Sequence, residues 1–224
     1  ELKLKYKNIK TMKKILLLSI VFAFACTNNT ETDKTTTEVD YTAYGDSTLI
    51  SHVKINPEES TVKWIGSKIT ESHEGTVNIH QGMLNIIDGK LDGGEFVLDM
   101  NTIKNTDIES EKYKSMLEEH LKDEDFFDVK NHPLSVIKIT DAVKKGRGVS
   151  YAITADLTIK GITHPINFDA DVKIEDLNYL ATAKIKIDRT KWGVEYNSDN
   201  FFKNLGDRLI KDEVEFDIIL RSEK

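Results

Sequence analysis

The stretch Ala152–Ile159 reads AITADLTI and decides the fold class of the chain. Its apolar residues fall on every second position, and these are Ile153, Ala155, Leu157 and Ile159. Successive side chains of a β-strand point to opposite faces of the sheet. The alternation therefore predicts a strand with one dry face.

The same alternation recurs along the chain from about His52 onward. The clearest further runs are residues 61–65, 95–100, 135–139, 166–172, 181–187 and 214–220, and segments 75–79 and 82–87 add one or two more strands. Turn-forming sequences separate the runs, at 88–89, 92–94, 146–148 and 176–178. About eight strands in one chain need closure or face-to-face packing, because their edges would otherwise be exposed.

One segment, Ser110–Leu121, has helical instead of alternating periodicity. Its apolar stripe consists of Tyr113, Met116, Leu117, His120 and Leu121, and Ser110 or Asp107 is available as a cap. A single helix is too few for strand–helix–strand units, so the sheet should be antiparallel. The sequence thus predicts an all-β fold, a closed antiparallel barrel of about eight strands with one amphipathic helix near the barrel end. The stripe either closes that end or covers a sheet face.

The amino-terminal segment has the features of an export signal. Lys13 and Lys14 follow Met12, an apolar run covers residues 15–25, and Cys26 comes directly after a small residue. The run is too short for a membrane helix. A cysteine in this place resembles the lipobox of bacterial lipoproteins, in which the cysteine is lipidated. The alternative is an ordinary signal peptide with a chance cysteine.

Three segments follow from this pattern. Residues 1–25 are expected to be an upstream extension and lipoprotein signal peptide, with the true start at Met12. Residues 26–51 are polar, with almost no apolar periodicity, and are predicted to be a flexible tether. Residues 52–224 are predicted to form the barrel domain.

Charge and residue types exclude several classes of protein. The chain has a net charge of −7, and residues 1–25 carry +5, so residues 26–224 carry −12. A domain this acidic is repelled by phosphate backbones, which argues against nucleic-acid binding. One cysteine excludes an intrachain disulfide and a Cys-rich metal site. His73 and His80 make at most an incomplete metal site, and Asp188-Arg189 is expected to form a structural ion pair with Glu195.

The inward-facing apolar residues allow two interpretations. In an open barrel they line a cavity for an apolar ligand, whereas in a closed one they are simply core. The set contains Trp64, Phe96, Leu98, Ile137, Ile139, Leu157, Phe168, Ile185 and Phe216. No nucleophile elbow, phosphate loop, dinucleotide fingerprint or zinc-protease motif accompanies them.

Several segments, read in order, resemble the YceI-like family over about residues 54–222. They are Ser60–Trp64, His120–Val129 with its Asp-Phe-Phe-Asp-Val block, His132-Pro133, Ala155–Ile166 and Ile187–Val194. The resemblance implies a lipocalin-like barrel around a long apolar ligand, with Phe126 and Phe127 at the pocket mouth. It also implies that Leu157 and Ile159 lie in the wall, and that Asp188, Arg189 and Trp192 hold the late strand-to-loop corner.

The resulting functional hypothesis is an exported lipoprotein that sequesters or carries a long isoprenoid lipid, either a polyprenyl compound or an isoprenoid quinone. The expected ligand-binding residues are Trp64, Phe96, Leu98, Phe126, Phe127, Ile137, Ile139, Ala155, Leu157, Ile159, Phe168, Ile185, Trp192 and Phe216. Cys26 would anchor the protein to the membrane, on the periplasmic side or at the outer membrane. No catalytic residue, metal or cofactor is expected beyond the bound lipid.

Two other classes of function stay open. One is an envelope stress or interaction module with a filled barrel and no small ligand. The other is a weak lipid-modifying enzyme. The oligomeric state is open between a monomer and a homodimer.

Overall fold

A computed structural model of the chain describes residues 48–175 and 178–224. Cys26, the predicted signal peptide and nearly all of the predicted tether lie outside these residues. The elements are β1 (Ile50–Lys54), β2 (Thr61–Ser67), β3 (Ser72–Ile87), β4 (Lys90–Asn105), α1 (Glu111–Lys122), β5 (Leu134–Lys144), β6 (Ser150–Ile159), β7 (Ile162–Glu175), β8 (Asn178–Asp188), β9 (Glu213–Arg221) and the 3₁₀ turns η1 (Arg189–Trp192) and η2 (Gly206–Arg208).

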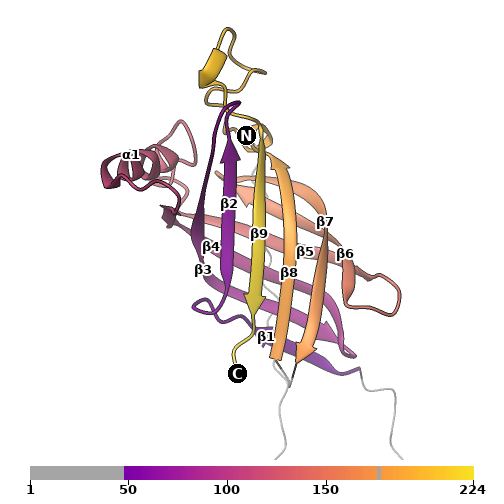
Figure 1. Ribbon diagram of the computed structural model, residues 1–224. Helices are drawn as coiled ribbons and strands as arrows, with labels where there is room; N and C mark the ends of the chain where they lie inside the picture. Colours follow the sequence, from indigo (N-terminus) through magenta and orange to yellow (C-terminus); the bar gives the residue numbers. More distant parts are fainter. Residues whose placement is uncertain (1–47, 176–177) are drawn as a thin grey trace, which may run out of the picture. The chain divides into compact units, whose positions relative to one another are not determined.

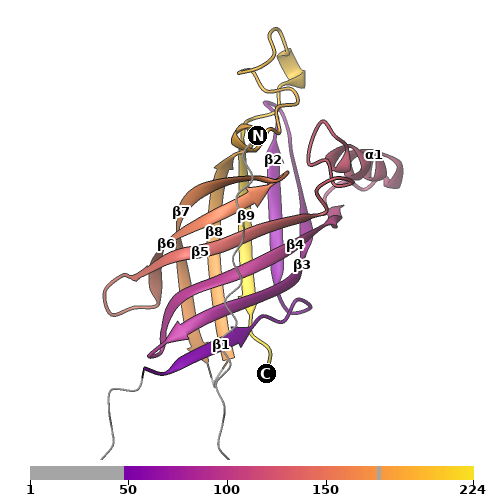
Figure 2. The same cartoon turned by 180° about the vertical axis from the view of Figure 1, so that it is seen from behind.

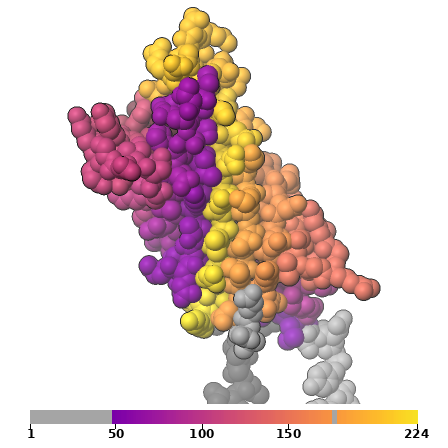
Figure 3. Space-filling view, viewed as in Figure 1, coloured from indigo at the N-terminus to yellow at the C-terminus, as the bar shows by residue number. Residues whose placement is uncertain are grey.

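Eight of the strands form a closed antiparallel barrel, as the alternation predicts. Strands β2 to β9 pair with their neighbours in sequence order, and β9 then pairs with β2. Figure 1 shows β2, β9 and β8 side by side, and Figure 3 shows the indigo surface of β2 against the yellow surface of β9. Closure leaves these eight strands no long open edge, which removes the pairing hazard of an exposed one.

Strand β1 is an addition to the barrel that the sequence pattern did not identify. It pairs with the second half of β3, Met83–Ile87, whereas β2 pairs with the first half of β3. Figure 2 shows β1 across the end of the barrel opposite α1. The strand starts at Ile50, two residues before the expected start of the domain.

Two local expectations from the sequence are corrected by the structure, one in β3 and one in β4. Segments 75–79 and 82–87 belong to this one strand, which is irregular between Ile79 and Gln81. The Asp92-Gly93-Gly94 sequence is not a turn but lies inside β4. The turn at Asp88-Gly89 does join β3 to β4, with φ angles of 49° and 70°, the left-handed region that tight hairpins need.

Helix α1 is the one α-helix among the described residues, and it packs beside β4 near the barrel end. Its apolar stripe is only partly covered. Leu121 is buried, but Tyr113 is 62% exposed and Met116 is 56% exposed. The side chain of Ser110 makes no capping hydrogen bond. None of the helices in residues 48–175 and 178–224 has the length and apolar character needed to cross a membrane.

Candidate functional site

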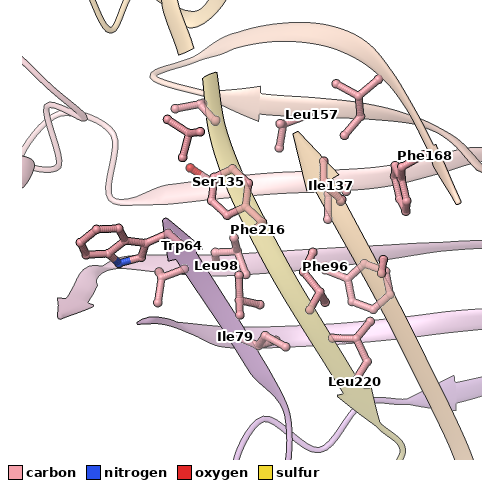
Figure 4. Close-up of a pocket in the computed structure, with 18 of the residues that line it drawn as sticks. Trp64, Ile79, Phe96, Leu98, Ser135, Ile137, Leu157, Phe168, Phe216 and Leu220 are labelled. Carbon is pink, nitrogen blue, oxygen red and sulfur yellow. The ribbon is translucent and has the colours of Figure 1, made fainter. Parts of the chain in front are cut away.

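The barrel encloses a cavity lined almost entirely by apolar side chains. Its volume is about 180 Å³, taken over the positions that the centre of a water molecule can reach, and roughly 10–15 Å³ of this measure holds one water. The lining extends from Phe126 and Phe127, next to α1, to Leu91 and Leu220 at the opposite end. Figure 4 shows lining side chains from several strands, among them Phe96, Ile137 and Leu220, gathered in one interior. A cavity of this chemistry favours an apolar occupant over water.

The interior is hollow and not filled to core density. Many inward side chains are well buried, such as Phe96 and Ile185. Others that line the same cavity are only partly buried, and these include Trp64, Leu98, Ile137, Phe168, Ala170, Ala183 and Phe216. Side chains in a close-packed interior would have lost this exposure. The residual exposure is therefore surface that an apolar ligand can cover.

Among the described residues, Arg189 is the one charged residue at the cavity wall, and each of its side-chain nitrogens already has a protein partner. Its guanidinium donates to the backbone oxygens of Lys211 at 3.1 Å, Val194 at 2.6 Å and Ile210 at 3.0 Å, and it pairs with Asp212 at 3.3 Å. Burial lowers the pKa of Arg189, and the charge of Asp212 opposes that change. The ion pair with Glu195 expected from the sequence is wrong, because Asp212 holds the partner position.

The Arg189 contacts fix the long segment between η1 and β9. Asp188 accepts from the backbone N–H of Thr190 at 3.0 Å and so caps η1. Asp212 also accepts from Ser198 Oγ at 3.0 Å. The segment carries Val194 and Ile210 to the cavity wall. A buried cation with a carbonyl or carboxylate partner on each of its nitrogens is a structural device that holds the segment in place.

Aromatic side chains gather where α1 meets the barrel. The ring of His120 lies 4.9 Å from that of Phe126 and 4.7 Å from that of Tyr196, both edge to face. The ring centroids of Phe126 and Phe127 are 6.4 Å apart, and both side chains line the cavity. The cluster joins α1, the segment after it and the segment after η1 over one end of the cavity.

Glu118 anchors α1 to this end. Its carboxylate accepts from the backbone N–H of Asn105 at 2.9 Å and from Lys104 at 3.1 Å. Burial acts to raise the pKa of Glu118, but the Asn105 hydrogen bond and the Lys104 charge outweigh it, so the pKa is lowered. The helix is therefore held by one buried carboxylate together with Leu121.

The structure brings together most of the residues proposed from the sequence. Twelve line the cavity: Trp64, Phe96, Leu98, Phe126, Phe127, Ile137, Ile139, Leu157, Ile159, Phe168, Ile185 and Phe216. Ala155 and Trp192 do not. Ala155 is 0% exposed and covered by its neighbours, and Trp192 is 1% exposed and donates to the backbone oxygen of Leu157 at 2.9 Å.

Sequence reasoning missed several lining residues. Ala170 and Ala183 lie opposite each other on β7 and β8 and leave space in the wall. Their alternation with Phe168 and Ile185 would have identified them had small residues been considered. Val194 and Ile210 lie outside the regular strands, where no periodicity marks an inward residue.

No metal centre is seen in the described parts of the chain, since no group of three or more His, Cys, Asp or Glu gathers there. His73 instead contacts Asp107, with Nδ1 and Oδ2 2.9 Å apart. Burial acts to raise the pKa of Asp107, but hydrogen bonds from Glu74 N–H, His73 and Asn105 lower it. The pair joins β3 to the segment before α1, away from the cavity lining.

Comparison with known proteins places this geometry in a family. The family model described as YceI-like domain matches residues 53–221. The fold is similar to that of BcnA from Burkholderia cenocepacia, with a TM-score of 0.63 and 17% identity over 75% of this chain and 99% of that one.

A second similar fold is that of a polyisoprenoid-binding domain from Saccharophagus degradans, with a TM-score of 0.57 and 15% identity over 78% of this chain and 99% of that one. A search of curated proteins found no match. The family model covers well over half of the sequence, including every barrel strand. The chain therefore belongs to the YceI-like family.

Proposed function

We propose that the protein binds a long isoprenoid lipid in its barrel and sequesters or carries it in the cell envelope. The observation that carries this proposal is the hollow apolar interior, in which side chains such as Leu98 and Phe168 keep exposed surface. Covering that surface is favourable by about 25 cal/mol per Å². A protein of similar fold that is described as a polyisoprenoid-binding domain supports the same ligand class.

The cavity also bears on the alternative of a filled barrel that serves only as an interaction module. A filled barrel of this size would leave no space of the observed volume.

An enzyme acting on the lipid would need titratable groups with perturbed pKa values inside the cavity. Among the described lining residues only Arg189 is charged; burial lowers its pKa, but each of its side-chain nitrogens is held by a protein partner, as expected of a structural residue. A binding role is therefore the better fit.

The direct experiment is extraction of the purified protein with organic solvent, followed by mass spectrometry. The proposal expects an isoprenoid lipid in near-stoichiometric amount from protein purified without added ligand. Protein that yields no lipid, and that takes up none from isoprenoid-containing vesicles, would contradict it.

A pair of substitutions separates a ligand cavity from a packed core. Ala183 lines the cavity and is partly exposed to it, so Ala183→Phe should remove the recovered lipid while destabilising the fold by less than about 1 kcal/mol. Ala155 faces the same interior but is fully covered. Ala155→Phe should therefore cost about 1–3 kcal/mol or more. Thermal melts beside lipid extracts test both, and equal destabilisation of the two variants would favour a filled barrel.

Anchoring through Cys26 is part of the proposal, supported by the basic, apolar and cysteine pattern of residues 13–26. Cys26→Ser should move the protein from the detergent phase to the aqueous phase of an envelope fraction. The wild type processed in the same cells is the control. Unchanged membrane association of the variant would mean that another feature tethers the chain.

A further inference from the structure

The segment between η1 and β9 extends beyond the barrel end that carries α1, as Figures 1 and 2 both show. Residues 195–209 of this segment, which we call the mouth loop, begin after Val194 and end before Ile210. Both of these flanking residues line the cavity. The ring of Tyr196, near the start of the loop, lies 5.5 Å from that of Phe126, another lining residue. The mouth loop therefore begins and ends at the cavity wall.

Hydrogen bonds hold the base of the mouth loop together. The backbone N–H of Ile210 donates to the oxygen of Asn197 at 3.0 Å and so joins the two sides of the loop. Asn200 Nδ2 donates to Asp212 at 2.7 Å, the same carboxylate that pairs with Arg189. A loop that is closed at its base in this way loses little freedom when its tip contacts a partner.

The tip of the mouth loop is apolar and exposed. Phe201 and Phe202 are adjacent, and they are 50% and 46% exposed. Neither ring stacks on another aromatic ring in the described part of the chain. Ile69, which is also exposed, follows Lys68, and Lys68 bridges to Ile210. Large apolar side chains from two neighbouring segments are thus exposed at the cavity end, and such groups mark interaction surfaces.

The charge of the tip differs from that of the domain. Residues 26–224 carry −12, but residues 200–206 contain a single charged residue, Lys203. Aromatic rings beside a lysine suit the surface of a bilayer, because the rings enter the head-group boundary while the ammonium stays among the phosphates. The tip therefore meets a phospholipid surface without the repulsion that the net charge of the domain produces.

We propose that the mouth loop docks the barrel on a phospholipid bilayer, with Phe201 and Phe202 entering the head-group boundary. This inference rests on the proposed function. An isoprenoid lipid is stored in a bilayer, and it would cross water at a high cost in exposed apolar surface. A cavity end placed against the bilayer avoids that cost, and the lipid then enters past Val194 and Ile210.

The proposed anchor is compatible with this orientation. Ile50, the first residue of β1, lies 24 residues after Cys26, and a chain of that length spans up to about 80 Å. The nine residues of β9 rise only about 30 Å. Anchoring through Cys26 therefore allows the α1 end to face the membrane, although β1 lies across the other end (Figure 2).

Lipid uptake from vesicles tests the docking role. All proteins are full chains that carry Cys26→Ser, so that no lipid anchor contributes, and they are freed of bound lipid. Adding Phe201→Ser and Phe202→Ser should slow the uptake of menaquinone-4 from phosphatidylcholine vesicles at least about fivefold, while the occupancy reached from detergent solution changes less than about twofold. The control changes another adjacent exposed pair, Leu49→Ser and Ile50→Ser, and should leave both quantities unchanged.

A fluorescent label reports insertion itself. Cys26 is the one cysteine of the chain, so Cys26→Ser with Phe202→Cys has a single thiol for an environment-sensitive nitrobenzoxadiazole dye. Phosphatidylcholine vesicles should raise the emission of this dye and shift it to the blue, with little dependence on salt. The same dye on Ile50→Cys should not respond.

The outcomes separate docking from lipid binding. Unchanged uptake without the two phenylalanines, equal slowing in the Leu49 and Ile50 control, or a dye at position 202 that does not respond would overturn the docking role and leave lipid binding standing. Loss of self-association in the phenylalanine variant would overturn it too, because the tip would then contact a second copy. Failure of the Cys26→Ser protein to take up menaquinone-4 or undecaprenol from detergent would instead overturn the proposed function.

Discussion

Which side chains a position in this barrel can accept depends on the atoms that lie opposite it. Two glycines of the β2–β3 hairpin show this dependence. Gly75 faces Trp64 across the β2–β3 pair with no room for a side chain. Gly66 also lines the cavity, but a Cβ there would meet nothing within 4 Å. Both are glycines in extended strands, so sequence alone treats them alike. Only their neighbours distinguish a required glycine from a replaceable one.

This contrast predicts different outcomes for two matched substitutions. Gly75→Ala should destabilise the fold by about 1–3 kcal/mol, because a backbone oxygen of β4 cannot yield without a shift of the strand. Gly66→Ala should be neutral or stabilising by up to about 1 kcal/mol, through reduced freedom of the unfolded chain. Urea unfolding of both variants measures the difference. Similar stabilities would mean that β3 and β4 separate easily at this point.

At the residue scale, the sequence located the cavity better than it located the roles of its residues. Alternation of apolar and polar residues identifies inward positions, and Phe96, Ile137 and Phe216 line the cavity as expected. It does not tell whether an inward residue touches a cavity or is covered by neighbours, as Ala155 is. It also cannot show that the N–H of Trp192 is paired and that of Trp64 is not.

Among the elements, α1 illustrates how a helix can be predicted while its burial is not. The 3.6-residue period marks the helix to within a residue at each end. The period does not reveal that Tyr113 and Met116 stay exposed, because the helix lies beside β4 instead of across the barrel opening. Its attachment depends on Glu118, a charged residue that the apolar pattern could not select.

The helix attachment should respond to acid. The pKa of Glu118 is lowered in the folded protein, so the charged form stabilises the fold above its ordinary pKa of 4.5. That stabilisation is lost as the pH falls through 4.5 and then through the lower folded value. Glu118→Gln should therefore lower stability by about 1–2 kcal/mol at pH 7, and the difference should shrink as the pH falls below 4.5.

Melting temperatures of wild type and Glu118→Gln between pH 3 and 7 check this expectation. The two curves should converge on the acid side, and other carboxylates such as Asp107 affect both proteins alike. A constant gap at all pH values would show that the glutamine loses packing instead of charge.

On the scale of the whole molecule, the closed antiparallel barrel follows from alternation together with the count of strands. The irregular parts do not follow from either. Strand β1 is short and largely exposed, so its sequence carries no dry face. The segment between η1 and β9 is held by Arg189 and Asp212, whose pairing depends on three-dimensional proximity and not on spacing in the sequence.

The charge of the molecule predicts how it meets a membrane. Residues 26–224 carry −12, so the unlipidated domain should bind anionic vesicles weakly at physiological salt. Sedimentation with phosphatidylglycerol vesicles measures this, and neutral vesicles serve as the control. Strong, salt-sensitive sedimentation with the anionic vesicles alone would show that a local basic surface overrides the net charge.

The pairing of β2 with β9 determines when the domain is complete. Strand β9 follows the other barrel strands in the sequence, yet it supplies both the second neighbour of β2 and the second neighbour of β8. A chain that stops before Glu213 leaves one edge of β2 and one edge of β8 unpaired. Unpaired strand edges are templates for aggregation. Since this final join spans nearly the whole domain sequence, loop-closure entropy places it late in folding. The cavity is therefore enclosed on all sides only once β9, a strand of nine residues, has paired with both β8 and β2.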